Sequence, residues 1–341
     1  MPGKKNRVTM QDIADKLKIS KNAVSLALNR KPGVSKELRE AVKKAAEELN
    51  YKGTSRYSKN RAAILILCPD YVNYDNPFYY QIFWALERRA RFYDFDCIIL
   101  SVSKEQERKN LLPQGFKMYN VAGFIIVGVF TTSYLRELRE SGFPGVITDT
   151  YSEEVPLPSV VTMNFQASFQ LTEYIIQKGH RDIGFIGSIS MSSSFFERWC
   201  GFVSAMKYYD LPVHDHFSFV RFNSAQEIDV KKEIADPILA LKTKPTAWLC
   251  SNDWLALFVM KTLKSAGIRV PQDVSLAGFD GIEKSSLSSP PLTTYRVKRE
   301  AIGERAIDLL VSLMKKDSFT SENYQIAIPG ELVIRQSILS R

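Results

Sequence analysis

Three polar side chains come just after short apolar runs in the second part of the sequence. Asp149 directly follows such a run and one Thr, Asn252 follows the stretch 247–250, and Asp280 follows the stretch 274–278. If these runs are buried parallel strands, the three residues lie at carboxyl ends of strands, where ligands of such sheets bind. Carboxylates accept hydrogen bonds and an amide both donates and accepts them, which suits the vicinal hydroxyls of a sugar. The pattern predicts a cleft for a small polar molecule.

The sequence lacks the short motifs of common enzyme chemistry. It has no Gly-x-Gly-x-x-Gly or Gly-x-x-x-x-Gly-Lys-Ser/Thr loop after a strand and no Gly-x-Ser-x-Gly elbow. The cysteines have no metal spacing with each other or with histidine, so we expect free thiols in a reducing cytosol: Cys68, Cys97, Cys200 and Cys250. We therefore expect no catalytic residues, no metal and no cofactor. An enzyme that processes a nucleotide or a sugar remains an alternative.

Positive charge is concentrated at one end of the chain. Residues 1–61 hold 16 Lys and Arg against 6 Asp and Glu, a net charge of +10, whereas residues 62–341 carry a net charge of −1. We call these parts the head and the body. A basic head on a near-neutral body predicts a module that binds a polyanion, attached to a part with another task.

No targeting or membrane segment is expected. The first seven residues are polar and basic and lead into no apolar core of signal-peptide length, and no run approaches the length of a membrane span. We expect a cytoplasmic protein with no membrane partner.

The head has the pattern of three short helices. Thr9 and Ser20 are placed to cap two amphipathic segments, the second of which runs from Lys21 to Asn29. After the break at Pro32-Gly33, a third helix is expected from Ser35 through to Asn50-Tyr51. Two short helices joined by a tight turn, under this charge, predict a helix-turn-helix.

The body predicts an α/β fold. Short apolar runs alternate with longer amphipathic stretches, and their continuous apolarity is typical of parallel strands buried on both faces. The runs are 64–67, 97–100, 124–127, 146–147, 160–161, 183–186, 217–220, 247–249 and 274–276. Nine or ten strands fit two doubly wound parallel sheets better than one.

Motifs in both parts resemble the lactose-repressor (LacI/GalR) family of bacterial transcription regulators. In the head these are Val8 to Ala14, Ile19-Ser20, Ala23-Val24-Ser25, Val34-Ser35 and Leu49-Asn50-Tyr51. In the body they are Asn76-Pro77-Phe78, 178–187, Arg198 with Gly201-Phe202, Ser251-Asn252-Asp253, 270–275, Gly278-Phe279-Asp280 and 290–294.

The resemblance implies three regions in the chain. These are a DNA-binding helix-turn-helix domain in residues 1–51, a hinge in 52–61, and a periplasmic-binding-protein-like body in 62–341. The body would have two subdomains joined by three crossovers. We place the N-terminal subdomain at about 62–163 and 296–324, and the C-terminal one at about 164–292 and 325–341.

In this family the second helix enters the major groove, which makes Lys21 and Asn22 the expected base readers. Asn can bond an adenine edge bidentately, Lys can donate to guanine, and the methyl of Ala23 can meet a thymine methyl. Lysines outside this helix are equally well explained as solvated charges. The predicted DNA contacts are Thr9, Ser20, Lys21, Asn22, Ala23, Ser25, Leu26, Asn29, Tyr51, Arg56 and Tyr57.

The sequence departs from the family pattern at two places. Leu26 stands where Arg is common, which removes a guanine reader and predicts an unusual operator. The hinge lacks the leucine that wedges into the minor groove, so either Arg56 or Tyr57 replaces it or no wedge forms.

The resemblance also implies a ligand set, which is Phe78, Asp149, Arg198, Asn252, Trp254 and Asp280. The plainer interpretation is that the polar members only cap helices and turns. We expect a homodimeric repressor that binds a pseudo-palindromic operator in double-stranded DNA and senses a small-molecule effector, a sugar. A protein partner or a sugar phosphate as effector is the alternative.

Overall fold

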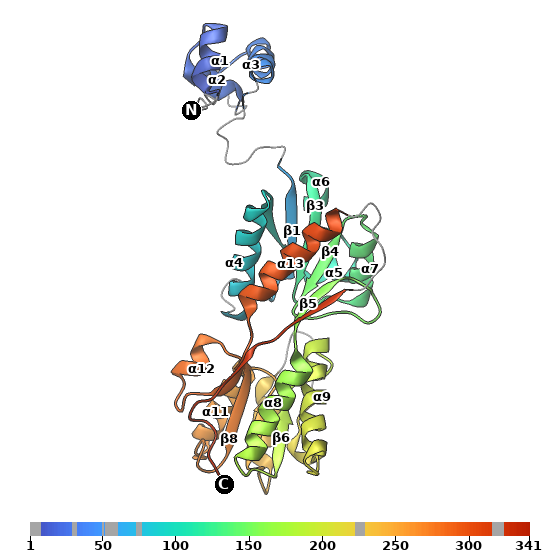
Figure 1. The fold of residues 1–341 in the computed structure, drawn as a ribbon, viewed down its shortest axis with the longest axis vertical. Coiled ribbons are helices and arrows are strands. Elements are labelled where there is room, and N and C mark those ends of the chain that lie inside the picture. Colours follow the sequence, from blue (N-terminus) through green and yellow to red (C-terminus); the bar gives the residue numbers. More distant parts are fainter. Residues whose placement is uncertain are drawn as a thin grey trace, which may run out of the picture. The chain divides into compact units, whose positions relative to one another are not determined.

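The computed structural model describes residues 8–28, 33–49, 51, 61–72, 77–221, 229–315 and 324–341. The chain separates into two compact units, residues 1–61 and residues 62–341. These units are the head and the body (Figure 1).

The head contains helices α1 (Met10–Leu17), α2 (Lys21–Leu28) and α3 (Lys36–Glu48). The expected caps are confirmed for the last two: Ala23 N donates to Ser20 Oγ (3.1 Å) and Leu38 N to Ser35 Oγ (3.2 Å). At α1, the Thr9 backbone N donates to the Asp12 carboxylate (2.6 Å). A small core joins the three helices: Ile13, Ala14, Val24, Ala27, Val42 and Ala45. The third helix ends at Glu48, so our extension to Asn50-Tyr51 was too long.

The first sheet of the body has strand order β10-β5-β4-β3-β1-β2 in the described residues, and every pair is parallel. Its strands are β1 (Ala63–Pro69), β2 (Asp96–Val102), β3 (Val121–Val127), β4 (Gly145–Thr148), β5 (Ser159–Thr162) and β10 (Gln325–Ile328). Its helices are α4 (Pro77–Phe92), α5 (Lys104–Arg108), α6 (Gly115–Met118), α7 (Thr132–Glu140) and α13 (Arg299–Met314). Alternate residues of β1 face opposite layers: Ile64 packs with α4 and α13, and Leu65 with α7. This sheet and its helices form the N-terminal subdomain.

The second sheet has the order β11-β9-β8-β7-β6 in the described residues. Its strands are β6 (Ile183–Ile186), β7 (Ala247–Cys250), β8 (Ser275–Asp280), β9 (Thr293–Arg296) and β11 (Glu331–Val333), of which only β11 is antiparallel to its neighbour. The helical segments are α8 (Asn164–Gln177), α9 (Ser193–Tyr208), η1 (Asp215–Phe217), η2 (Lys231–Ala235), α10 (Asp236–Ala240), α11 (Asp253–Ser265) and α12 (Glu283–Leu287). They form the C-terminal subdomain with this sheet.

The chain passes between the two sheets three times. The passages lie between β5 and α8, between β9 and α13, and between β10 and β11. Figure 1 shows these segments converging between the two sheets of the body. The two doubly wound sheets confirm the predicted fold class.

Two details of the prediction need correction. The run 217–220 is not a strand, because it ends η1 and then makes only an isolated bridge between Phe219 and Ile186. Residues 325–328 form β10 and pair with β5, so they belong to the N-terminal subdomain and not to the C-terminal one. The two residues Pro329-Gly330 connect β10 to β11.

Candidate functional site

Arg198, a predicted ligand residue, contacts several residues from different elements. It stands in the second turn of α9 and is 2% exposed. Its Nε donates to Asn164 Oδ1 (2.9 Å), and its Nη1 donates to Ser251 O (2.7 Å) and to Asp280 Oδ1 (3.3 Å). The guanidinium carbon lies 3.8 Å from the centroid of the Phe279 ring, a cation–π contact. Two predicted ligand residues, Arg198 and Asp280, are thus brought into contact.

The position of α9 depends on a close approach to α8. A Cβ on Gly201 would collide with the carbonyl oxygen of Phe165 in α8. The absent side chain lets the two helices approach, and the hydroxyl of Ser168 donates to the carbonyl of Arg198 across the same seam (2.5 Å). Helix packing therefore brings Arg198 to Asn164, the first residue of α8.

Asp149 and Asp280 are carboxylates at strand ends of the two subdomains; Asp280 is buried, and Asp149 is half-buried with its Oδ1 atom enclosed. Both have a left-handed backbone conformation, with φ of 65° and 111°. The pKa of Asp149 is raised to about 7, mainly by burial; the charge of Arg198 opposes this rise and that of Asp280 adds to it. Burial likewise raises the pKa of Asp280 to about 6, against the lowering effect of Arg198. This mutual influence places Asp149, Arg198 and Asp280 in one electrostatic cluster.

Arg299, the first residue of α13, belongs to the same site but was missed in the sequence. Its Nη1 donates to Asp280 O (3.1 Å), its Nη2 to Gly281 O (3.3 Å), and its Nε to Gln81 Oε1 (2.7 Å). Its guanidinium carbon lies 5.7 Å from the ring centroid of Phe78, which is buried. No motif or predicted strand marked it in the sequence, and only its contacts distinguish it from a surface charge.

Asn252 and its neighbours have clear structural roles. The Asn252 side-chain oxygen caps α11 by accepting from Leu255 N (2.8 Å). Asp253 is buried and accepts from Thr294 Oγ1 (2.6 Å) and Ile282 N (2.9 Å). Trp254 is 57% exposed and stacks on Phe258. The capping interpretation therefore explains the Asn252 side-chain oxygen; the amide nitrogen takes no part in the cap.

The predicted DNA contacts of the head divide into exposed and half-buried residues. Lys21 and Asn22 are exposed in the first turn of α2, whereas Ala23, Ser25 and Leu26 are half-buried. Thr9 and Ser20 both take part in helix caps, and Tyr51 is half-buried against the core of the head. Three of the predicted DNA contacts lie outside the described residues: Asn29, Arg56 and Tyr57.

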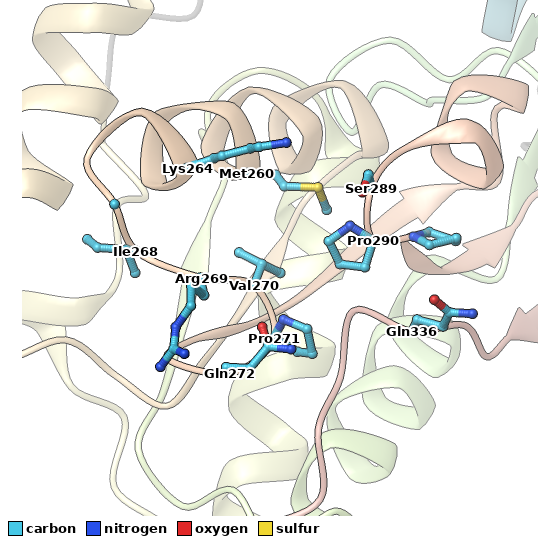
Figure 2. Close-up of a pocket in the computed structure, with 12 residues that line it drawn as sticks. Met260, Lys264, Ile268, Arg269, Val270, Pro271, Gln272, Ser289, Pro290 and Gln336 are labelled. Atoms are coloured by element: carbon cyan, nitrogen blue, oxygen red, sulfur yellow. The ribbon is translucent and has the colours of Figure 1, made fainter.

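A groove of about 580 Å³ lies elsewhere on the C-terminal subdomain (Figure 2). Its lining includes Met260 and Lys264 in the second half of α11, the loop 267–272, and Pro290. Asn252 caps the opposite end of α11, and none of the predicted ligand residues lines this groove. It is separate from the predicted cleft.

The four cysteines are free thiols, as predicted. Within the described ranges, no three His, Cys, Asp or Glu side chains are grouped so that they could hold a metal ion. We also find no helix there with the length and apolarity needed to cross a bilayer.

Comparison with known families and proteins bears on both units. Residues 9–53 match the bacterial regulatory proteins of the lacI family, and residues 172–338 match the periplasmic binding protein-like domain. The chain is 27% identical over 340 residues to the HTH-type transcriptional repressor PurR of Pasteurella multocida, covering 98% of this chain and 99% of that protein. It is 29% identical to the ribose operon repressor of Halalkalibacterium halodurans, covering 96% of each.

Solved structures share the fold. The lac repressor dimer bound to operator and the anti-inducer ONPF superposes with a TM-score of 0.69 at 23% identity, covering 98% of this chain and 100% of that one. A LacI family regulator of Enterococcus faecium with bound ribose gives a TM-score of 0.67 at 23% identity, covering 82% and 99%.

Proposed function

The chain belongs to the lacI family of bacterial regulatory proteins and is a DNA-binding transcriptional regulator, and we propose that an uncharged, polyhydroxylated molecule in the cleft controls its operator affinity. The predicted ligand residues come from both subdomains, since Asp149 follows β4 and Arg198 and Asp280 belong to α9 and β8, so a ligand bound to them contacts both subdomains. A ligand that binds one arrangement of the subdomains more tightly shifts the population toward it. The choice of a sugar-like effector is our inference.

The observation that carries this proposal is the state of the polar groups in the cleft. Asp149 Oδ1 is buried and has no hydrogen-bond partner in the described part of the chain. A buried acceptor without a partner is costly, so a ligand that donates to it gains affinity. A hydroxyl group donates in this way, whereas a phosphate or carboxylate would add negative charge beside Asp149 and Asp280.

The two arginines of the cleft are already engaged by protein acceptors. Arg198 donates to Asn164, Ser251 and Asp280, and Arg299 donates to two carbonyl oxygens and to Gln81. Their positive charge is balanced by the two carboxylates. This arrangement disfavours the sugar phosphate alternative, because an anion would have to displace protein acceptors from an arginine.

A thermal-shift screen of the purified protein tests the proposal. We expect stabilisation by one of a set of neutral sugars that includes ribose and cellobiose, because a ligand bound only to the native state stabilises it. The same sugar phosphorylated should give a smaller shift. Asp149→Asn replaces an acceptor with a donor and should reduce the shift. A phosphorylated compound that stabilises more than every neutral sugar would contradict the proposal.

Two copies of the chain are expected to act together. The lac repressor relative is a dimer on its operator, and here α4 exposes Tyr80 (47%) and Trp84 (57%) beside the edge strand β2. Large exposed aromatic side chains are typical of a surface that another protein covers. We propose this surface as the dimer interface in the N-terminal subdomain. Trp84→Glu should shift sedimentation toward the monomer, and an unchanged dimer would exclude this surface.

A further inference from the structure

The segment after β4 in the N-terminal subdomain touches the start of α9 in the C-terminal subdomain. Thr150 Oγ1 lies 2.8 Å from Ser193 Oγ, and Tyr151 N donates to the same Ser193 Oγ (3.0 Å). The Ser194 hydroxyl donates to the carbonyl oxygen of Asp149. These bonds join the two subdomains at the edge of the cleft.

Glu197 extends this contact into the protein interior. Tyr151 Oη donates to one oxygen of its carboxylate (3.1 Å), and Asn164 Nδ2 donates to the other (3.2 Å). The oxygen of the same Asn164 amide accepts from Arg198 Nε (2.9 Å). Asn164 and Arg198 are 1% and 2% exposed, so this bonding leaves the amide of Asn164 only one favourable orientation.

We propose that Glu197 is a positioning residue that holds Arg198 in its ligand-binding orientation only while Tyr151 of the other subdomain is engaged. The chain Tyr151–Glu197–Asn164–Arg198 then couples the closed arrangement of the subdomains to the shape of the binding site. This inference rests on the proposed function, because it takes Arg198 to contact the effector. It adds a regulatory link to that site, made by residues that are not among the predicted ligand contacts.

Each member of the chain is needed for the next. Without the Glu197 carboxylate, Asn164 Nδ2 keeps only its bond to Thr162 O (3.1 Å), and the amide that accepts from Arg198 Nε is held by one hydrogen bond fewer. Without the Tyr151 hydroxyl, one carboxylate oxygen loses its bond across the subdomains. A glutamine at 197 can replace the carboxylate, since its oxygen can accept from Asn164 and its amide can donate to the tyrosine hydroxyl.

The C-terminal subdomain contains a matched pair for comparison. Tyr209 Oη donates to Glu173 Oε1 (2.5 Å) and joins the segment after α9 to α8. It is also a tyrosine–glutamate hydrogen bond, but it does not cross between the subdomains. Tyr209→Phe therefore controls for the loss of such a bond anywhere on these two helices.

The test uses the full-length protein without added ligand, so it does not depend on the identity of the effector. Hydrogen exchange of the Tyr151 amide reports the contact between subdomains, and exchange of Arg198 Nε–H, observed by NMR, reports the arginine. One hydrogen bond contributes about 1 kcal/mol. We therefore expect Tyr151→Phe and Glu197→Ala each to accelerate exchange of the backbone amide at position 151 about fivefold. Both changes should also accelerate exchange at Arg198 Nε–H, because the proposed link makes the arginine depend on Tyr151 as well as on Glu197.

Three further variants complete the design. Glu197→Gln should restore slow exchange at both positions, Tyr151→Phe should add nothing in the Glu197→Ala background, and Tyr209→Phe should change neither rate. Additive effects of Tyr151→Phe and Glu197→Ala would overturn the proposal, as would an unchanged Arg198 rate in either of these variants. If the coupling is found but no neutral sugar stabilises the protein, the proposed effector class fails and the link between subdomains stands.

Discussion

The head and the body present their functional side chains in opposite ways. In the head, Lys21 and Asn22 are exposed on α2, while a separate small core holds the three helices together. In the body, Arg198 and Asp280 are buried and bonded to each other. We therefore propose that recognition and folding use different residues in the head and the same residues in the body. A change at a recognition residue should be silent for stability in the head and costly in the body.

The strongest test of this contrast is the salt dependence of DNA binding. The net charge of +10 lies in the head, and lysines and arginines that neutralise phosphates release counterions. If about 6 to 10 phosphate contacts form per dimer, affinity for a selected operator should fall by about 10³ to 10⁵ between 50 and 200 mM salt. The thermal unfolding of the body should be far less sensitive over the same range. A gel-shift titration of the full chain measures the first effect. An affinity that does not change with salt concentration would contradict the assignment of DNA binding to the basic head.

Arg198→Ala tests the other side of the comparison. Removing one partner of a buried ion pair leaves an uncompensated charge, which costs about 3 to 5 kcal/mol of unfolding free energy. The ligand-induced thermal shift should disappear as well. Arg88→Ala is a suitable control, because its bonds to Glu300 and Glu304 are on the surface, where such pairs contribute under about 1 kcal/mol. Equal effects of the two changes in urea unfolding would contradict a buried, structural role for Arg198.

Asn22→Ala should separate recognition from stability. We expect a loss of about 1 to 3 kcal/mol in discrimination at one base pair per half-site, with unfolding changed by less than about 0.5 kcal/mol. Lys36→Ala, in the first turn of α3, should instead weaken all sequences evenly. Selection of operators from a random pool measures both. An unchanged base preference for the Asn22 variant would exclude it as a reader.

Much of the fold could be predicted because its signals are local. Helix caps such as Ser20 and Ser35, and apolar runs such as 64–67, can be identified without knowing what they pack against. The strands that we missed are short and carry polar or half-exposed residues: β9, β10 and β11. The run 217–220 was misread because apolar residues are needed for burial in a loop as well as in a strand.

The site was only partly predictable for a related reason. Asp280 follows a recognisable strand and Arg198 stands in a motif, so both could be found in the sequence. The roles of Arg299 and Glu197 depend on where the passages between the sheets bring distant helices. A charged residue in the first turns of a helix is usually a solvated charge, and only tertiary contacts distinguish these two from the rest.

The pH dependence of effector binding gives the smallest expected effect and sharpens the account of the cleft. In this account Asp149 accepts a hydrogen bond from the ligand, so binding favours its ionised form. Because its pKa is raised to about 7, most of the molecules carry the proton at pH 6 and lack it at pH 8. Affinity for the effector should therefore rise about tenfold from pH 6 to pH 8, because the ionised fraction of a group with this pKa rises about tenfold over that range.

Stability of the ligand-free protein should change in the opposite direction. A carboxyl group whose pKa is higher in the folded state than its ordinary 3.8 binds more protons when folded. Its contribution to stability is present at low pH and is lost as pH rises through about 7. Asp149→Asn cannot titrate, so subtracting its melting curves from those of the parent isolates this residue from Asp253 and Asp280, which have raised pKa values too. Effector affinity that falls with rising pH in the parent chain would mean that the ligand accepts a hydrogen bond from protonated Asp149 instead of donating one to its carboxylate.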